Sequence, residues 1–264
     1  MDELIRRGYF SDSVVKKQPH YHDCHQIIFI TEGKAEFCVN EAKFTASKGS
    51  LIIFSRYENH SVNLCSQRYE RYVLQIDSSV DATQNKIYSI FSNRPSGFCN
   101  MLDVSDNYDQ FERIFSQIAG EYATPTQFSK DMMGLLFNEL LILICRRLPQ
   151  MLYSFDEENF EMVADIQRRF EQEYNKRYTL DELAREYNIS PSSLSHQFKR
   201  ITGASVMGYL QSCRMATAKN YLSKTTCSIG EIVERCGFSD NSNFSRTFKS
   251  VCGLSPSEFR SKYK

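Results

Sequence analysis

The pattern of apolar and polar positions divides the chain into a β-rich first half and a helical second half. Over residues 8–78 apolar and polar residues alternate in short runs, which is typical of strands joined by turns. We expect strands at residues 26–31, 35–39, 43–45 and 51–54, with turns at 32–33, 40–41 and 48–50. Strands this short and evenly spaced predict a small barrel.

Two helices are expected next, over residues 109–121 and 126–148. Asn107 or Asp106 is the expected cap of the first helix, and Pro125 suits the start of the second. The second helix has an apolar stripe with charged interruptions. The stripe consists of Met132, Leu135, Leu136, Glu139, Leu140, Leu143 and Arg147. It is broader than the covering of a barrel alone would require.

One pattern occurs twice in the C-terminal half. Residues 179–184 correspond to residues 228–233 at an offset of 49, and the offset then becomes 50 because the turn gains one residue. Six residues of the second part recur identically. They are Ser192, Ser195, Phe198, Lys199, Gly203 and Ser205, which recur as Ser242, Ser245, Phe248, Lys249, Gly253 and Ser255. The repeat predicts two copies of one structural unit.

Each copy has the features of a short helix, a tight turn and a second helix. Thr179 and Ser228 are the expected N-caps, and a Glu follows each of them three residues later, which is the capping-box arrangement. Asn188 and Gly237 suit the left-handed conformation that a tight turn needs. A glycine then ends each second helix.

The second helix of each copy has one apolar and one polar face. The apolar positions recur at i, i+4 and i+7. They are Leu194, Phe198 and Ile201 in the first copy and Phe244, Phe248 and Val251 in the second. Hydroxyls, amides and cations remain on the other face, which suits the major groove of DNA, where base edges can be distinguished. Two ordinary helical hairpins are the alternative, although they give no reason for the polar face to repeat.

The second copy contains a long and specific motif. It reads SIGEIVERCGFSDNSNFSRTFK over residues 228–249 and GLSPSEFR over residues 253–260. The motif resembles the signature of the AraC/XylS family of transcription regulators. The resemblance covers about residues 160–260, including a long helix near 205–222 that joins the two units. It implies that both second helices enter successive major-groove segments on one face of DNA, about 34 Å apart.

The resemblance also carries over the residues that contact DNA. The candidates for base contact are Ser192, Ser195, His196, Asn241, Ser242, Asn243 and Arg246. Arg suits a bidentate contact with guanine and Asn suits adenine, so Arg246 is the strongest of these candidates. The candidates for phosphate contact are Lys199, Arg200 and Lys249, which would add affinity without sequence information.

The N-terminal half resembles the two motifs of a cupin barrel, the usual sensor domain of this family. The resemblance rests on HYHDCHQ at residues 20–26, followed by Gly33, Gly49 and His60. It implies an effector pocket. The pocket residues would be His20, His22, His25, Gln26 and His60. Three of these histidines fall where cupin enzymes bind metal, but Gln26 occupies the usual acidic position, so we expect a ligand pocket without metal or other cofactor. A metal site is the alternative.

Together these features predict an α+β chain of two domains. A cupin-like β-barrel would span residues 1–105, and a helical dimerisation pair would span 106–148, since such helices form the dimer contact in this family. The polar stretch 149–159 is the expected linker. An all-α DNA-binding domain would span 160–264, with helix-turn-helix units at 179–203 and 228–253. A homodimer is therefore expected, and packing of the helix pair within one chain is the alternative.

The distribution of charge agrees with a DNA-binding C-terminal end. The formal net charge is zero, but residues 187–264 contain 11 Lys and Arg against 4 Asp and Glu, or +7, which leaves −7 for the rest. The nine cysteines are scattered singly without a CxxC pair, so we expect reduced, mostly buried thiols. The start, MDELIRRGYF, lacks the apolar core of a secretory signal, and a cytoplasmic protein is expected.

The sequence therefore predicts a transcription regulator rather than an enzyme. It would bind double-stranded DNA and respond to a small-molecule effector in the N-terminal barrel. One alternative is a metal-dependent cupin enzyme fused to a DNA-binding module. Another is a ligand-independent regulator whose barrel serves only assembly.

Overall fold

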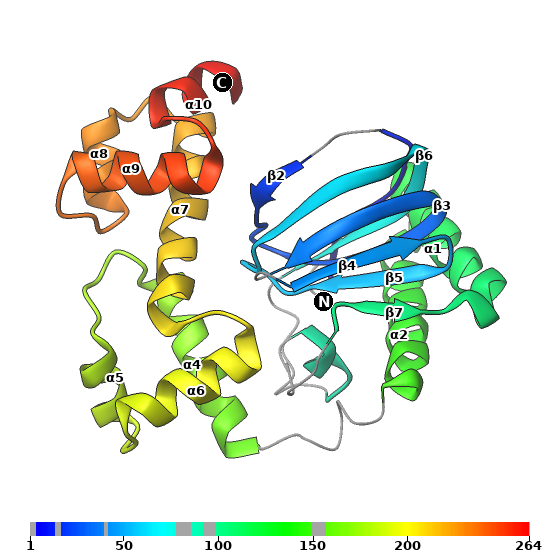
Figure 1. Ribbon diagram of the computed structural model, residues 1–264, viewed down its shortest axis with the longest axis horizontal. Helices are drawn as coiled ribbons and strands as arrows, with labels where there is room; N and C mark the ends of the chain where they lie inside the picture. Colours follow the sequence, from blue (N-terminus) through cyan, green and yellow to red (C-terminus); the bar gives the residue numbers. More distant parts are fainter. Residues whose placement is uncertain are drawn as a thin grey trace.

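The computed structural model shows a sheet domain followed by a helical domain, which is the α+β architecture predicted from the sequence (Figure 1). It describes residues 4–13, 17–39, 42–77, 86–91, 99–148 and 157–263. The strands are β1 (Ile5–Ser11), β2 (Lys17–His20), β3 (His25–Val39), β4 (Ala42–Ser47), β5 (Ser50–Phe54), β6 (His60–Ile76) and β7 (Met101–Asp103). The N-terminal domain also contains the short 3₁₀ helices η1 (Lys86–Phe91) and η2 (Ser105–Asn107) and the helices α1 (Tyr108–Ala123) and α2 (Ser129–Arg147). The C-terminal domain contains α4 (Glu157–Gln172), α5 (Leu180–Glu186), α6 (Pro191–Thr202), α7 (Val206–Lys224), α8 (Ile229–Arg235), α9 (Asn241–Cys252) and α10 (Pro256–Tyr263).

The described strands pair into an antiparallel sheet that does not close. The order is β1-β6-β3-β5-β7, with β2 paired to β6 and β4 paired to β3. Within the described residues the predicted barrel is therefore corrected to an open seven-stranded sheet. The long strand β6 was not predicted from the sequence. It pairs with both β1 and β3.

The predicted turn at residues 32–33 is wrong, because β3 continues through it. The register of β3 against β6 shifts on both sides of Gly33, which has a φ of 86°. Such shifts are β-bulges, and a Cβ at Gly33 would lie 2.0 Å from the carbonyl oxygen of Arg68. The predicted turn at 48–50 is confirmed, with Gly49 at a φ of 82°. The predicted turn at 40–41 lies outside the described residues.

Both faces of the central strands β3 and β5 are buried over residues 25–31 and 50–54, and side chains alternate between the two faces along each strand. Ile27 and Phe29 of β3 belong to the cluster that packs against α1 and α2, whereas Ile28 and Ile30 belong to a second cluster on the opposite face. Phe29 stacks on Phe115 of α1 with ring centroids 5.2 Å apart. The helices therefore cover one face and leave the other for a pocket.

The two helices predicted after the sheet are confirmed as α1 and α2. Asn107 takes the N-cap position of α1, although its side chain makes no capping hydrogen bond. On α2 the predicted stripe divides between two faces. Leu136 and Leu140 are buried in the domain core, while Met132 and Leu135 are exposed.

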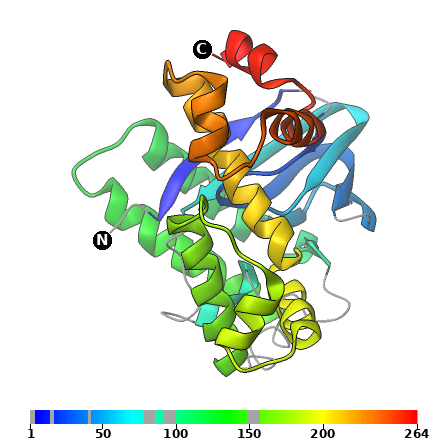
Figure 2. The same ribbon diagram turned by 90° about the vertical axis from the view of Figure 1, so that its left-hand side faces the viewer.

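The C-terminal domain consists of two helical units joined by α7. One core lies among α4, α5, α6 and the first part of α7, and another lies among the rest of α7, α8, α9 and α10. Figures 1 and 2 show α7 running between the two units. Of the predicted linker, residues 149–156 lie outside the described residues and 157–159 already belong to α4.

Candidate DNA-reading helices and effector pocket

Both predicted capping boxes are present. The Thr179 hydroxyl accepts a hydrogen bond from the Glu182 backbone N–H, and the Glu182 carboxylate accepts one from the Thr179 backbone N–H. Ser228 and Glu231 make the same pair of bonds at the start of α8. These reciprocal bonds fix where each first helix begins.

The turn inside each unit also has the predicted conformation. Asn188 has a φ of 54° and Gly237 has a φ of 73°. At Gly237 a Cβ would lie 2.5 Å from the carbonyl oxygen of Asn175, so the close approach of these backbones requires glycine there. The second helices, α6 and α9, follow these turns and end at Gly203 and Gly253, both with positive φ.

The second helices bury the apolar face that their spacing predicted. Leu194, Phe198 and Ile201 of α6 are buried, as are Phe244 and Phe248 of α9. Only Val251, the last of the six predicted positions, is half-buried. Because one face of each helix is anchored in a core, the direction of the polar face is fixed.

All ten predicted DNA contacts lie outside the buried face. The exposed ones are Ser192, His196, Lys199, Asn241, Ser242, Arg246 and Lys249, and the half-buried ones are Ser195, Arg200 and Asn243. Arg246 donates from Nη2 to Oδ1 of Asn243 at 3.4 Å. A guanidinium and an amide, the groups that suit guanine and adenine, therefore lie side by side on α9.

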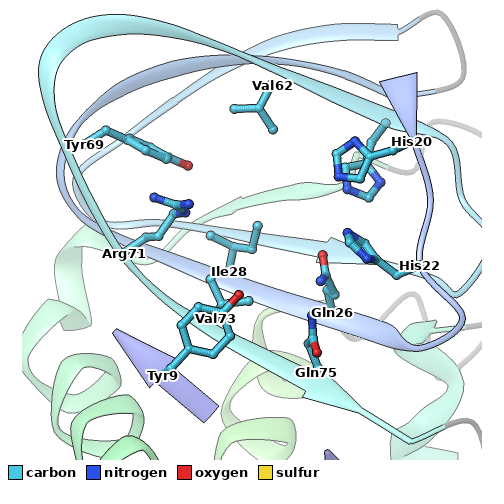
Figure 3. Close-up of a pocket in the computed structure, with 11 residues that line it drawn as sticks. Tyr9, His20, His22, Gln26, Ile28, Val62, Tyr69, Arg71, Val73 and Gln75 are labelled. Atoms are coloured by element: carbon cyan, nitrogen blue, oxygen red, sulfur yellow. The ribbon is translucent and has the colours of Figure 1, made fainter. Parts of the chain in front are cut away.

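A pocket lies on the face of the sheet opposite α1 and α2 (Figure 3). About 500 Å³ of empty space lies between its walls, part of it open to solvent. Its lining consists of Tyr9, His20, His22, Gln26, Ile28, His60, Val62, Tyr69, Arg71, Val73 and Gln75. Four of the five predicted pocket residues are among them. The fifth, His25, instead accepts a hydrogen bond at Nδ1 from the Arg56 backbone N–H and stacks on Phe91.

Several pocket residues were not predicted from the sequence. Tyr69, Arg71, Val73 and Gln75 occupy alternate positions along β6, so their side chains lie on one face of the sheet. This spacing of two would have identified them if the strand had been predicted. Tyr9 joins them from β1.

Tyr69 is a hydrogen-bond donor directed at the pocket. Its side chain is 2% exposed, and among the described groups its hydroxyl has no hydrogen-bond partner. Burial raises the pKa of Tyr69 to about 12, so the phenol keeps its proton at neutral pH. The Arg71 guanidinium lies 4.7 Å from the centre of the Tyr69 ring. A ligand with oxygen acceptors would satisfy both side chains.

Three histidines meet at the other side of the pocket (Figure 3). One ligand nitrogen from each of His20, His22 and His60 lies within 4.8 Å of the other two. His20 and His60 are paired across β2 and β6, and His22 is the second residue after the end of β2. These three side chains have the nitrogen donors and the proximity that a metal ion would need.

Two loops next to these histidines contact the C-terminal domain. We call them the docking loops, residues 21–24 and 55–59. Tyr21 packs into the core of the second helix-turn-helix unit, and its hydroxyl donates to the carbonyl oxygen of Ser212 at 3.3 Å. Tyr57 packs edge-to-face on Tyr209 of α7 at 5.1 Å. The Tyr57 N–H donates to the carbonyl of His22 at 2.8 Å, which joins the two loops.

A buried charge cluster reinforces this contact. Arg56 is 7% exposed and forms an ion pair with Glu171 of α4. Its Nε donates to the Tyr209 hydroxyl at 2.7 Å, and that hydroxyl donates to Glu171 at 3.1 Å. A buried guanidinium requires such partners. The three residues are far apart in the chain and belong to no local pattern, so the sequence did not predict the cluster.

The cysteines are free thiols. Cys24, Cys145, Cys213 and Cys236 are buried, whereas Cys65 and Cys99 are exposed and the remaining three are half-buried. Burial raises the pKa of Cys213 to about 11, which keeps this thiol protonated and unreactive. In the described part of the chain no helix is both long and apolar enough to span a bilayer.

Comparison with known families defines the class of protein. Residues 5–133 match the AraC-like ligand binding domain, and residues 183–262 match a helix-turn-helix domain. The chain is therefore a DNA-binding regulator that joins a ligand-binding domain to a helix-turn-helix domain. It belongs to the AraC family of transcription regulators.

Similarity extends along nearly the whole chain. The transcriptional activator RhaR of Mannheimia succiniciproducens is 22% identical over 92% of this chain and 87% of its own length. The transcriptional activator RhaS of Escherichia coli is 25% identical over 91% of this chain and 86% of its own length. The structure of ToxT from Vibrio cholerae with a bound unsaturated fatty acid has the same fold, with a TM-score of 0.65 at 17% identity, covering 97% of this chain and 94% of ToxT.

Proposed function

We propose that this protein reads an operator sequence with α6 and α9, in the cytoplasm, and that a small molecule in the pocket regulates this activity. The observation that carries the proposal is the repeated unit. Both copies have the same capping box and the same kind of tight turn, and both turn a polar helix face to solvent. Two such helices suit two segments of the major groove.

The polar residues divide by chemistry into two roles. Arg246 would contact a guanine and Asn241 or Asn243 an adenine, while Ser192, Ser195, His196 and Ser242 would make smaller base contacts. Lys199, Arg200 and Lys249 would bind phosphates. Arg246 and Lys249 are exposed to solvent with both domains in place.

The effector would bind between Tyr69 and Arg71 on one side of the pocket and the histidines on the other. His22 lies within the first docking loop and His60 directly follows the second, so a ligand that favours one arrangement of the loops would shift the position of the DNA-binding domain. RhaR and RhaS are named as activators, and we propose activation here as well. These relatives are regulators rather than enzymes, and we propose that this chain has no catalytic role.

The protein is further proposed to form a homodimer through α2. Four large apolar side chains are exposed on or just before this helix, at a spacing of three, four or seven residues. They are Phe128, Met132, Leu135 and Ile142. Exposed apolar side chains gathered on one helix face mark an interaction surface, and the same face on a second copy would complement it.

Selection from random oligonucleotides with the full chain tests DNA reading. We expect enrichment of sites with two short motifs whose centres are about 10 base pairs apart. A selection that enriches no sequence would overturn the proposal. A thermal-shift screen of small molecules separates effector-dependent from ligand-independent regulation, since a bound effector stabilises the folded protein.

A further inference from the structure

We propose that His20, His22 and His60 bind one divalent transition-metal ion, and that this ion is a signal to which the DNA-binding domain responds. The inference rests on the proposed function, because it names an effector for the pocket. It differs from the expectation of a metal-free pocket, since the sequence could not show how closely the three side chains approach one another.

The three histidines are arranged to close around an ion. Their ring centroids are 4.9 Å apart for His20 and His22, 4.4 Å for His20 and His60, and 5.4 Å for His22 and His60. Nitrogens bound to a tetrahedral metal at about 2.1 Å lie about 3.4 Å from one another. In this structure the ligand nitrogens lie within 4.8 Å of one another, and rotation of the side chains can shorten these distances to that value. The pairing of β2 with β6 holds the backbones of His20 and His60 meanwhile.

The chemistry of the donors selects the class of metal. Imidazole nitrogen suits zinc, copper, nickel, cobalt and iron, whereas calcium and magnesium prefer oxygen. Nδ1 of His60 lies 2.9 Å from the Glu58 carbonyl oxygen, which can only accept, so Nδ1 holds the proton and the neutral ring has its lone pair on Nε2. Phe54 stacks on this ring at 4.0 Å. A carbonyl that fixes the tautomer is the usual support of a metal-binding histidine.

The remaining coordination positions would open into the pocket. Among the described lining residues there is no carboxylate, so the protein would leave the ion with its positive charge. Water or an anion would then complete the coordination sphere. Tyr69 and Arg71, across the pocket in Figure 3, are a donor and a cation that suit the same anion.

The metal ligands and the docking loops share the same short segments. Tyr21 lies between His20 and His22 in the chain, its hydroxyl reaches Ser212, and Lys219 lies 4.5 Å from the centre of its ring. Tyr57, with a φ of 60°, holds the His22 carbonyl through its N–H. His22 lies outside the strand pairing, so an ion that draws it towards His60 would shift the loop backbone next to Tyr21 and the carbonyl that accepts from the Tyr57 N–H. Binding of the ion would therefore bias the contact of Tyr21 and Tyr57 with α7.

The first test is cobalt titration of the full chain after chelation. We expect one ion per chain, with the visible absorption of cobalt bound by nitrogen. The variants His22→Gln and His60→Gln should each weaken binding at least about tenfold. The matched control is His196→Gln, which removes the histidine on α6 and should bind cobalt as the unmodified chain does. Cobalt–thiolate charge-transfer absorption, or unchanged affinity in both pocket variants, would overturn the proposal. Melting curves without metal confirm that each variant is folded.

The second test measures the response with zinc. Hydrogen exchange should change in both docking loops and in α7 when zinc is added, and operator affinity should change about fivefold or more. Both effects should be absent in His22→Gln and His60→Gln. Operator binding that is sequence-specific but identical with and without zinc overturns this inference and leaves the proposed function standing. Absence of sequence-specific binding in either state overturns the proposed function itself.

Discussion

The surroundings of an arginine decide what it does in this protein. Arg56 is buried and held by Glu171 and Tyr209, so its charge is committed to the contact between the domains. Arg246 is exposed, and its hydrogen bond to Asn243 is long, at 3.4 Å. A guanidinium with such a weak local bond can turn to a base edge at little cost, which suits sequence reading.

Arg246→Ala and Lys249→Ala form a matched pair on α9. Loss of Arg246 should weaken operator binding by about 1–3 kcal/mol and relax specificity at one base pair. Loss of Lys249 should weaken binding to all sequences alike and reduce the salt dependence by about one unit. Affinities for operator and random DNA at several salt concentrations check both. Equal losses on the two DNAs for Arg246→Ala would contradict its assigned role.

Helix ends determine the geometry of each DNA-reading unit. The capping boxes at Thr179 and Ser228 and the left-handed residues Asn188 and Gly237 fix the start of the first helix and the turn after it. Together they set the angle at which the second helix leaves the core. The capping boxes and turn residues can be recognised in the sequence, because each acts over only three or four neighbouring residues.

Ser228→Ala removes the hydroxyl from the cap of α8. We expect a loss of about 1 kcal/mol in the free energy of unfolding, measured by urea denaturation. Ser250→Ala, at an exposed position within α9, is the control and should be nearly neutral. A loss of equal size in both variants would show that the capping bond is not the cause.

Acid should weaken the same capping box. Hydrogen bonds from the backbone N–H and hydroxyl of Ser228 hold the pKa of Glu231 below its ordinary value. A carboxyl whose pKa is lower in the folded state stabilises the fold above its unfolded pKa, and this contribution is lost as the pH falls through the folded pKa. Glu231→Gln should therefore lose less stability than the unmodified chain between about pH 5 and about pH 3. Parallel acid-dependent unfolding curves for the two proteins would contradict this.

The exposed face of α2 is an element-scale feature of another kind. Leu135 is 67% exposed, and a charge there would face the second copy in a dimer. Leu135→Glu should therefore shift sedimentation from dimer to monomer at micromolar concentration. Met207→Glu adds the same charge to an exposed position of α7 and should sediment as the unmodified chain does. A monomer in the unmodified protein would end the dimer proposal.

At the scale of the whole molecule, the two domains are held together by side chains rather than by the chain connection alone. Tyr21, Arg56 and Tyr57 of the N-terminal domain contact α4 and α7 of the C-terminal domain. These residues adjoin the pocket histidines, so the pocket and the DNA-binding domain share one set of contacts. Under the proposed function, regulation would therefore depend on how firmly the docking loops hold α7.

Glu171→Gln leaves the buried charge of Arg56 without its counter-charge. We expect a loss of roughly 2 kcal/mol in stability and faster hydrogen exchange in the docking loops. Adding Arg56→Met should recover part of the loss, because the unpaired charge is then removed. Denaturation of both single variants and the double variant checks this. If the losses in free energy of unfolding from the two substitutions simply add, the pair does not couple the domains.

The sequence by itself determined the C-terminal domain, from its capping boxes, turn residues and apolar spacing to the polar faces of α6 and α9. Each of these features depends on neighbours within about one helical turn, so the sequence records it locally. The sequence also indicated a β-rich N-terminal half. It did not indicate that β3 continues through residues 32–33, that β6 is a strand, or that the described strands form an open sheet.

Only the tertiary structure decided which distant side chains meet. It removed His25 from the pocket, added Tyr69 and Arg71, set how closely the predicted His20, His22 and His60 approach one another, and paired Arg56 with Glu171. Contacts of this kind follow from strand pairing and from the packing of one domain on the other. No local pattern in the sequence records them, because the partners are separated by tens of residues and each depends on the position of whole elements.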